Sequence, residues 1–302
     1  MWIEDLHKKT ERAWKDSEAY LNSHPDLKSK LEDSLWAFHS LGQLIPETIE
    51  NVGSGHYFPY SEAFYNLQIS FQLAMQAFYH QALIGLRPVL ELSAMCIYYD
   101  INDKSYIEIK PWISSKIRTP SFKSMLDELF NLDYYKRFDQ TFNLRKRLEN
   151  FYDELSGFVH IRGYKNSSSG LSRSNFPCLQ QENLEAFIEK MVQTVRFTAE
   201  LLLLKYPIGI IPLPITEKFG LNGPVGGFLE QNDIKYILAI LEDKEVEFLK
   251  DIAKNDEHVQ NIIRCFNELP NITDEEIRKQ SEEFDRFLKE QKPDQTGDEN
   301  KQ

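Results

Sequence analysis

The hydrophobic and polar positions along this chain mostly follow the pattern of amphipathic helices. Between residues 142 and 164, apolar side chains recur every three or four residues, which marks the buried face of a helix. The apolar positions are Leu148, Phe151, Leu155 and Phe158. The polar positions beside them, at the same spacing, are Glu149, Asp153, Ser156 and His160. Gly163 is expected to end this helix, because glycine readily adopts the left-handed conformation of a helix C-terminus.

The same pattern predicts further helices on both sides of this stretch. Their ranges are 1–24, 27–45, 61–97, 121–130 and 183–204. The range 61–97 is the longest, and Pro88 is expected to kink or break it because proline lacks a backbone N–H. Arg87 and Glu91, one turn apart, then lie at an irregularity in a largely apolar helix. A charged pair at such a position needs partners if it is buried.

Loop signals divide the chain into parts. Residues 206–227 hold four prolines and five glycines and separate a main helical domain at 1–205 from a smaller acidic part at 228–292, with two or three helices. The segment 206–227 is expected to pack along the main domain, and 293–302 to be a disordered tail. The Ser-, Asn- and Gly-rich run 165–177 is expected to be a mobile surface loop. The predicted fold is all-α: a helical bundle with a long kinked helix, followed by the acidic helical part.

The composition narrows the classes of site. Gly and Pro are few, 13 each, which disfavours a sandwich or barrel. The three cysteines lie far apart, with no CxxC pair and no Cys/His cluster, so we expect neither a disulfide framework nor a structural zinc site. We also expect no other metal and no cofactor. The charged first residues predict no secretion signal. The longest apolar run, 197–215, contains Glu200, Lys205 and three prolines, so we expect no membrane span and a cytoplasmic protein.

The charges are unevenly distributed along the chain. The net charge is −12, and residues 206–302 hold 12 Lys and Arg against 21 Asp and Glu. Residues 104–173 have the opposite balance, with 13 Lys and Arg against 8 Asp and Glu. A local basic excess attracts polyanions even on an acidic protein, which predicts a surface that binds RNA. Ordinary solvated helix faces are the other interpretation of this excess.

Two segments resemble helices of the HEPN-type proteins, which are helical proteins found widely in prokaryotic toxin and phage-defence systems. The segment Phe151–His160, FYDELSGFVH, is similar to the later helix of some members, which ends in His. The segment Ala82–Glu91, ALIGLRPVLE, is similar to their earlier helix, which bears Arg and Glu. The resemblance covers about residues 60–205. It implies a component of a defence or toxin-type system that acts on RNA or senses it.

The candidate catalytic residues are His160, Arg162, Arg87 and Glu91. Metal-independent RNA cleavage needs a base of near-neutral pKa to take the 2′-hydroxyl proton, and His160 suits this role. It also needs cationic donors for the developing phosphate charge, and Arg162 and Arg87 suit that role. Ribonuclease members of the family carry Arg, four to six residues, and then His on one helix. In this chain the nearest Arg before His160 is Arg147, 13 residues upstream, so ribonuclease activity stays open.

The competing hypothesis is a non-catalytic helical interaction or scaffold protein. In it Arg87, Glu91 and His160 form a buried polar network that pins two core helices, and the acidic C-terminal part binds a protein partner. The absent Arg–His spacing favours this hypothesis, whereas the basic excess favours RNA. A homodimer is a further expectation, because helical proteins of this kind often pair through helices. The isolated histidines, among them His80, are expected at the surface or in the core.

Overall fold

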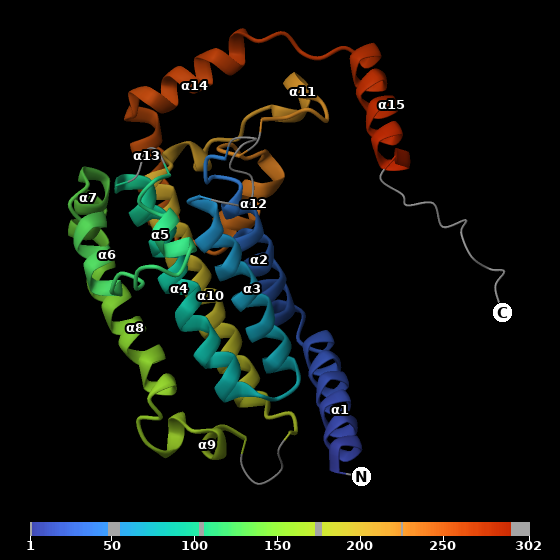
Figure 1. Ribbon diagram of the computed structural model, residues 1–302, viewed down its shortest axis with the longest axis vertical. Helices are drawn as coiled ribbons and strands as arrows, with labels where there is room; N and C mark the ends of the chain where they lie inside the picture. Colours follow the sequence, from blue (N-terminus) through green and yellow to red (C-terminus); the bar gives the residue numbers. More distant parts are fainter. Residues whose placement is uncertain (1, 48–54, 103–105, 173–176, 225, 291–302) are drawn as a thin grey trace, which may run out of the picture.

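A computed structural model describes residues 2–47, 55–102, 106–172, 177–224 and 226–290. Within these ranges the chain forms fifteen α-helices and two short 3-10 helices, and no strand (Figure 1). The predicted all-α fold is therefore confirmed.

Four helices form the centre of the bundle: α2 (Pro25–Gly42), α3 (Tyr57–Met75), α4 (Tyr79–Asn102) and α10 (Gln181–Lys205). Helix α10 packs against both α2 and α4, and α3 lies along α4. The helices α1 (Trp2–Asn22), α5 (Lys110–Ile113), α6 (Phe122–Leu129), α7 (Asp133–Phe142), α8 (Leu144–Val159) and α9 (Ser168–Ser172) surround this centre (Figure 1). The core is apolar because the central helices bury their Leu, Ile, Phe and Tyr side chains against one another.

The prediction of one long kinked helix over 61–97 is wrong, because the chain reverses after Met75 and continues as α4 beside α3. Ala77 adopts the left-handed conformation, with φ of 63°, and Phe78 N donates to Leu73 O at 2.8 Å. Pro88 lies inside α4 and does not end it. Both helices bury apolar residues against the bundle, so the hydrophobic pattern runs through the turn without a visible break.

Helix α8 ends earlier than predicted. His160, and not Gly163, follows its last residue as the C-cap, and Ile161 takes the left-handed conformation with φ of 47°. The run 165–177 was predicted to be a loop, but a 3-10 helix, η1 (Tyr164–Asn166), and the short helix α9 occupy its first part. Residues 173–176 lie outside the described residues.

The Pro/Gly-rich segment packs along the bundle as predicted. It contains the 3-10 helix η2 (Pro207–Ile210) and α11 (Ile215–Phe219), and it buries Ile208, Ile210 and Leu213. Beyond it lie four helices where two or three were predicted: α12 (Gln231–Ala239), α13 (Asp243–Asn255), α14 (Glu257–Glu268) and α15 (Asp274–Glu290). Helix α12 packs on α2, and α13 packs on η2 and α7. Helix α15 extends away from the body (Figure 1), and the tail 293–302 lies outside the described residues.

Helix α4 is long and apolar enough, by length and composition, to cross a membrane. Most of its apolar window is buried inside the bundle, which is typical of a core helix.

Gly85 marks the close approach of α3 and α4, and its replacement tests this packing. A Cβ on Gly85 would lie 2.1 Å from Oγ of the buried Ser70, which donates to Asn66 O at 2.7 Å. We expect Gly85→Ala to lower the free energy of unfolding, measured by urea denaturation, by about 1–3 kcal/mol. The double variant Gly85→Ala/Ser70→Ala removes the clashing oxygen and gains the higher helix propensity of Ala, so it should recover most of this loss. Equal losses in the two variants would contradict the close approach.

Candidate functional site

Arg87 and Glu91 lie one turn apart on α4 and share a third partner, Tyr152, on α8. Arg87 Nη2 lies 3.1 Å from Glu91 Oε1 and donates to the Tyr152 hydroxyl at 2.5 Å. The Tyr152 hydroxyl donates to Glu91 Oε1 at 2.5 Å, and the Arg87 guanidinium lies over the Tyr152 ring, 4.7 Å from its centroid. Burial and the hydrogen bond to Glu91 raise the pKa of Tyr152 to about 12, so the hydroxyl keeps its proton at neutral pH.

The same tyrosine connects this pair to α6. The Phe122 ring stacks on the Tyr152 ring with centroids 4.4 Å apart. The side chains of Arg87 and Glu91 are only 22% and 26% exposed, so water solvates them poorly. Each of the two charges therefore depends on the other and on the Tyr152 hydroxyl for its polar partners. The cluster of Arg87, Glu91, Tyr152 and Phe122 therefore joins α4, α6 and α8, which is a structural role.

The structure does not bring His160 into this cluster. His160 is exposed at the end of α8, and its side chain makes no hydrogen bond or ion pair with the described residues. It lies eight residues beyond Tyr152, or roughly 12 Å along the helix axis. Arg162 is half-exposed, and its Nη1 binds Asp153 Oδ1 at 2.7 Å. Of the four predicted site residues, only Arg87 and Glu91 are in contact.

A different histidine, His80, binds the end of α8. Its ring is buried, its Nε2 lies 3.0 Å from Phe158 O, and its Nδ1 lies 3.2 Å from Ser168 Oγ. His80 therefore bridges α4, α8 and α9. A histidine held in this way positions helices, because both ring nitrogens already have partners.

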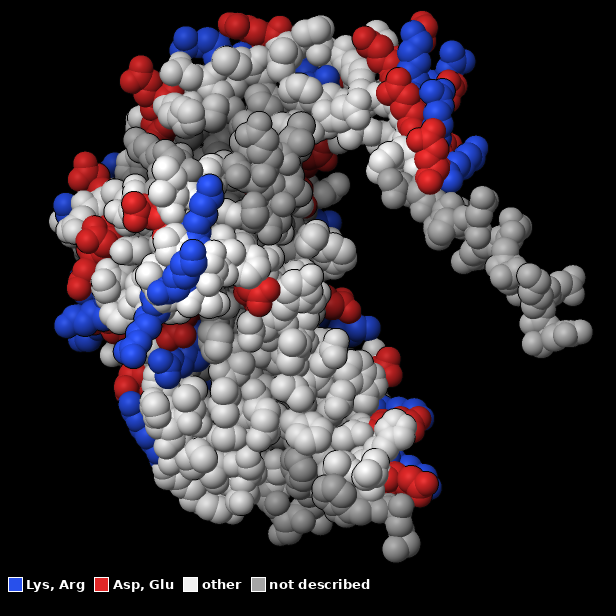
Figure 2. Space-filling model, in the orientation of Figure 1, with Lys and Arg blue, Asp and Glu red and all other residues white. Residues whose placement is uncertain are grey.

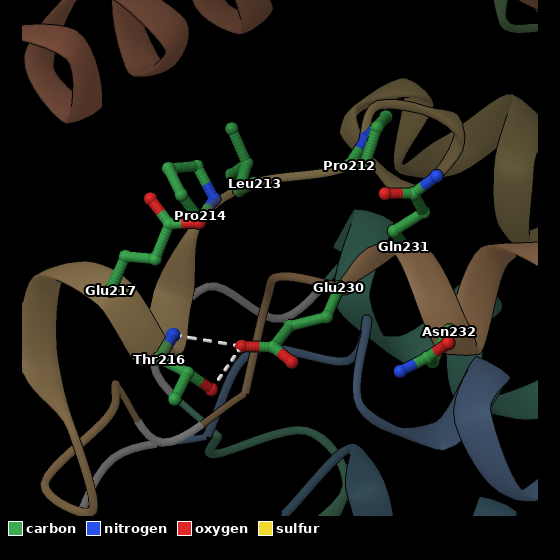
Figure 3. Close-up of a pocket in the computed structure, with 8 residues that line it drawn as sticks. All are labelled: Pro212, Leu213, Pro214, Thr216, Glu217, Glu230, Gln231 and Asn232. Carbon is green, nitrogen blue, oxygen red and sulfur yellow. Dashed lines mark hydrogen bonds between the residues drawn. The ribbon is translucent and has the colours of Figure 1, made fainter.

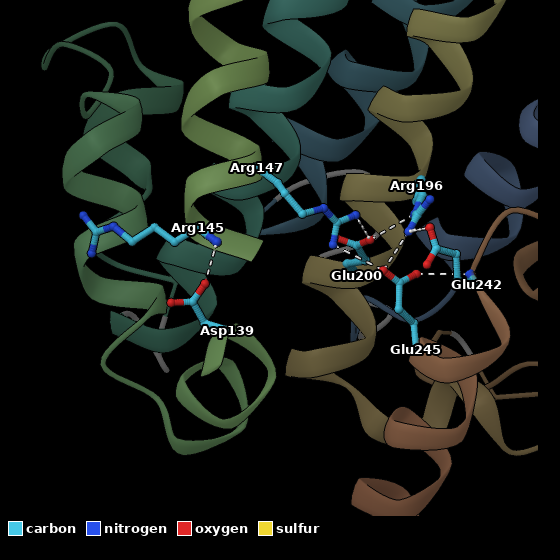
Figure 4. A network of polar contacts seen from close by, with 7 residues as sticks. All are labelled: Asp139, Arg145, Arg147, Arg196, Glu200, Glu242 and Glu245. Carbon is cyan, nitrogen blue, oxygen red and sulfur yellow. Dashed lines mark hydrogen bonds and ion pairs between the residues drawn. The ribbon is translucent and has the colours of Figure 1, made fainter. Parts of the chain in front are cut away.

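The most buried charges of the molecule form a second network between α8, α10 and α13 (Figure 4). Arg147 donates to Glu200 Oε1 at 2.8 Å and to Glu245 Oε1 at 3.2 Å. Arg196 donates to Glu200 Oε1 at 3.2 Å, to Glu245 Oε1 at 2.7 Å and to Glu242 Oε1 at 2.8 Å. Glu200 and Glu245 are fully buried, at 0% and 1% exposed. The network therefore attaches α13 to α8 and α10.

Glu200 differs chemically from the other two carboxylates of the network. Both arginines donate to its Oε1, whereas its buried Oε2 has no hydrogen-bond partner within the described structure. Burial raises the pKa of Glu200 to about 7, although the neighbouring Arg147 opposes this rise. The proton of the neutral form belongs on Oε2, because Oε1 is already an acceptor. Protonation leaves two arginines balanced by Glu242 and Glu245.

A cleft of about 510 Å³ opens beside this network. Its wall includes both arginines, but Glu189, Glu242 and Glu245 line it as well. Three carboxylates repel a phosphate, so the cleft is a poor site for RNA. Within the described residues, no group of three His, Cys, Asp or Glu side chains is arranged to hold a metal ion.

A smaller cleft, of about 330 Å³, lies between α11 and α12 (Figure 3). Glu230 occupies its centre and accepts hydrogen bonds from the backbone N–H of Thr216, at 2.7 Å, and from the Thr216 hydroxyl. Glu230 also caps α12 in a capping box with Asp233. Its carboxylate is therefore used to hold the connecting segment in place.

A group of cations without ion-pair partners lies elsewhere, on α5, the start of α6 and the segment between them. Residues 109–123 contain four basic residues and no acidic residue. These four are Lys110, Lys116, Arg118 and Lys123; all are exposed, and none forms an ion pair within the described structure. Figure 2 shows a row of Lys and Arg side chains on this face of the molecule. We call these four residues the basic face.

The sequence indicated the basic face and the Arg87–Glu91 pair, but neither Tyr152 as the third partner of that pair nor the network around Glu200. The excess of Lys and Arg over 104–173 includes the basic face. The network around Glu200 had no such signal, because Arg147 and Glu200 lie 53 positions apart. The one hint was a glutamate inside the long apolar stretch of α10, where a buried charge requires partners.

The Glu200 network predicts a pH-dependent stability. The pKa of Glu200 in the folded protein, about 7, exceeds the ordinary value of 4.5, so the folded state holds this proton more tightly than the unfolded state. The stability that the proton contributes is fully present below pH 4.5 and is lost as the pH rises through 7. Glu200→Gln mimics the neutral acid. Its advantage over wild type in the free energy of unfolding should grow between pH 5 and 8 to about 3 kcal/mol. Urea denaturation at each pH measures this difference.

Glu189→Gln is the matched control, because Glu189 is exposed on the same helix and faces the same cleft. It should follow the wild-type pH profile. A constant difference between Glu200→Gln and wild type across this range would show that Glu200 does not titrate near neutral pH.

The two histidines near the end of α8 should respond differently to truncation. His80→Ala removes a buried ring and its two polar contacts, and should lower the free energy of unfolding by about 1–3 kcal/mol. His160→Ala removes an exposed ring and should change it by less than about 0.5 kcal/mol. Guanidinium denaturation compares the two. A large loss in His160→Ala would place His160 in the polar network after all.

The chain was compared with protein-family models, with curated proteins and with solved structures, and no match was found in any of the three. The resemblance to HEPN-type proteins therefore stays a prediction from the two segments that carry it. Function is inferred from the residues described above and their geometry.

Proposed function

We propose that this protein binds RNA through the basic face. The observation that carries this proposal is the set of four exposed cations without ion-pair partners in a segment free of acidic residues. Lys and Arg in this state bind phosphates with release of counterions, which provides most of the non-specific affinity for nucleic acid. The protein as a whole is acidic, so binding is confined to this surface.

Other arginines are less suited to contact phosphate. Arg147 and Arg196 are committed to buried glutamates, Arg87 to Glu91 and Tyr152, and Arg145 to Asp127 and Glu149. Binding phosphate there would require breaking an existing ion pair. The cations of the basic face need no such rearrangement.

The proposed activity is binding or sensing, without cleavage. A ribonuclease needs a general base and a cation close to the same phosphate. Here Arg87 is held two turns of α8 away from His160, and Arg162 is paired with Asp153. A role in a prokaryotic defence or toxin-type system rests on the HEPN resemblance alone.

A second candidate function, a helical protein that binds a protein partner, is favoured by α15. This helix has no buried residue, and its large apolar side chains are in contact with solvent: Phe284, Phe287 and Leu288 are 53%, 54% and 45% exposed. Aromatic and aliphatic side chains gathered on an exposed helix are typical of an interaction surface.

RNA binding is tested by fluorescence anisotropy with a labelled oligonucleotide at several salt concentrations. Lys116→Ala/Arg118→Ala should weaken binding, because two phosphate contacts are lost. The slope of log K against log salt should fall in magnitude by about 2. The RNA should stay intact on a denaturing gel.

The matched control is Lys8→Ala/Lys254→Ala, which removes two exposed lysines that make no ion pair within the described residues and lie outside the basic face. Its affinity and salt slope should equal those of wild type. Equal weakening in both double variants would mean that binding follows the overall charge, and the basic face would no longer be the site.

A further inference from the structure

Helix α15 is an exposed amphipathic helix that the rest of the chain leaves almost uncovered. Its contacts with the body are made mainly through Gln280, whose side chain binds Phe219 O at 3.1 Å and Leu221 N at 2.8 Å. Ile277, Phe284, Phe287 and Leu288 follow one side at helical spacing and are at least 37% exposed. An isolated helix of 17 residues is marginally stable in water, so this face is expected to have a partner.

The charges of α15 indicate what that partner carries. The helix holds seven acidic and four basic residues, and Glu276, Glu283 and Glu290 recur every seven positions along one edge of the apolar side. Antiparallel pairing with a second copy of α15 is disfavoured, because it places these three glutamates opposite the same three glutamates. The partner surface should instead be basic, with apolar residues among its cations.

The basic face of the same protein has this composition. Ile113 and Ile117 lie among its four cations and are 37% and 49% exposed. An acidic helix with an apolar side and a basic surface with exposed isoleucines are complementary in both charge and hydrophobicity.

The two surfaces belong to one chain but do not meet within it. In Figure 1, α15 lies on the far right of the molecule, whereas α5 and α6 lie on the left, with α2 and α3 between them. Figure 2 shows the same separation between the charged helix and the row of basic side chains. Contact between them therefore requires a second copy of the chain.

We infer that α15 of one copy covers the basic face of another copy and competes there with RNA. The competition rests on the proposed RNA binding, whereas the association of the two copies does not. The acidic helix takes the place of the phosphate backbone, so the basic face is covered until RNA displaces the helix. Two copies that exchange their α15 helices bury both surfaces at once, in a closed two-fold arrangement.

The experiment is a charge-reversal exchange, read by sedimentation equilibrium of the full chain. One variant is Glu283→Lys/Glu290→Lys, which reverses the edge of α15 and leaves Glu276 in place, because Glu276 accepts hydrogen bonds from Thr273 at the start of the helix. The other is Lys116→Glu/Arg118→Glu on the basic face. Wild type should associate with rising concentration, and each variant alone should associate at least roughly tenfold more weakly.

An equimolar mixture of the two variants should associate again. In a mixed pair, the reversed α15 meets the reversed basic face, and the wild-type α15 meets the wild-type basic face, so both contacts join opposite charges. Circular dichroism and thermal melting confirm that both variants are folded. A wild type that stays monomeric at all concentrations, or a mixture that associates no better than its components, overturns the proposal. Added RNA should dissociate the wild-type complex. RNA that fails to bind any variant counts against the proposed function, while restored association in the mixture still supports the contact.

Discussion

The buried ion network between α8, α10 and α13 joins helices that lie far apart in the sequence. Arg147 and Arg196 reach the interior from two helices and meet Glu200 and Glu245, which are completely shielded from water. Removing either arginine leaves buried carboxylates without a compensating charge in a site of low polarity, which destabilises a fold by several kcal/mol. The position of α13 therefore depends on this network, and with it the course of the chain into α14 and α15.

The structure separates cations that hold the fold from cations that are free to bind. The arginines of α4, α8 and α10 have carboxylate partners, and those with the most buried partners join helices distant in sequence. The basic face has no such partners and lies on a short helix, the start of the next one and the segment between them. Surface electrostatics contribute little to stability but strongly to association with charged partners. The proposed binding function is therefore assigned to the four clustered, unpaired cations of the basic face.

The sequence predicted much of the fold because most helices bury a single stripe of apolar residues. Helices α6, α8 and α10 lie close to where the periodicity placed them. The reversal at Ala77 left no trace in the sequence, since neither Gly nor Pro marks the turn and apolar residues continue through it. The end of α8 was misplaced for a related reason: Ile161 takes the left-handed conformation that glycine usually provides.

The candidate site was less predictable than the fold. Local spacing identified the pair of Arg87 and Glu91 correctly, because both lie on one helix. Their third partner, Tyr152, is 65 positions from Arg87, and a contact at that distance depends on how α4 and α8 pack. The count of basic residues over 104–173 also includes two kinds of arginine: those in ion pairs, such as Arg145, and those without an ion pair, such as Arg118. Only the three-dimensional arrangement distinguishes the two groups.

The central claim is that RNA contacts the basic face and not the end of α8. Ultraviolet cross-linking of the bound RNA, followed by mass-spectrometric identification of the linked peptides, tests this claim most directly. We expect cross-links in peptides from residues 107–123, which contain the half-buried Trp112 and the exposed Ile113 and Ile117. Cross-links confined to the peptide around His160 and Tyr164 would contradict it and would place the RNA at the end of α8.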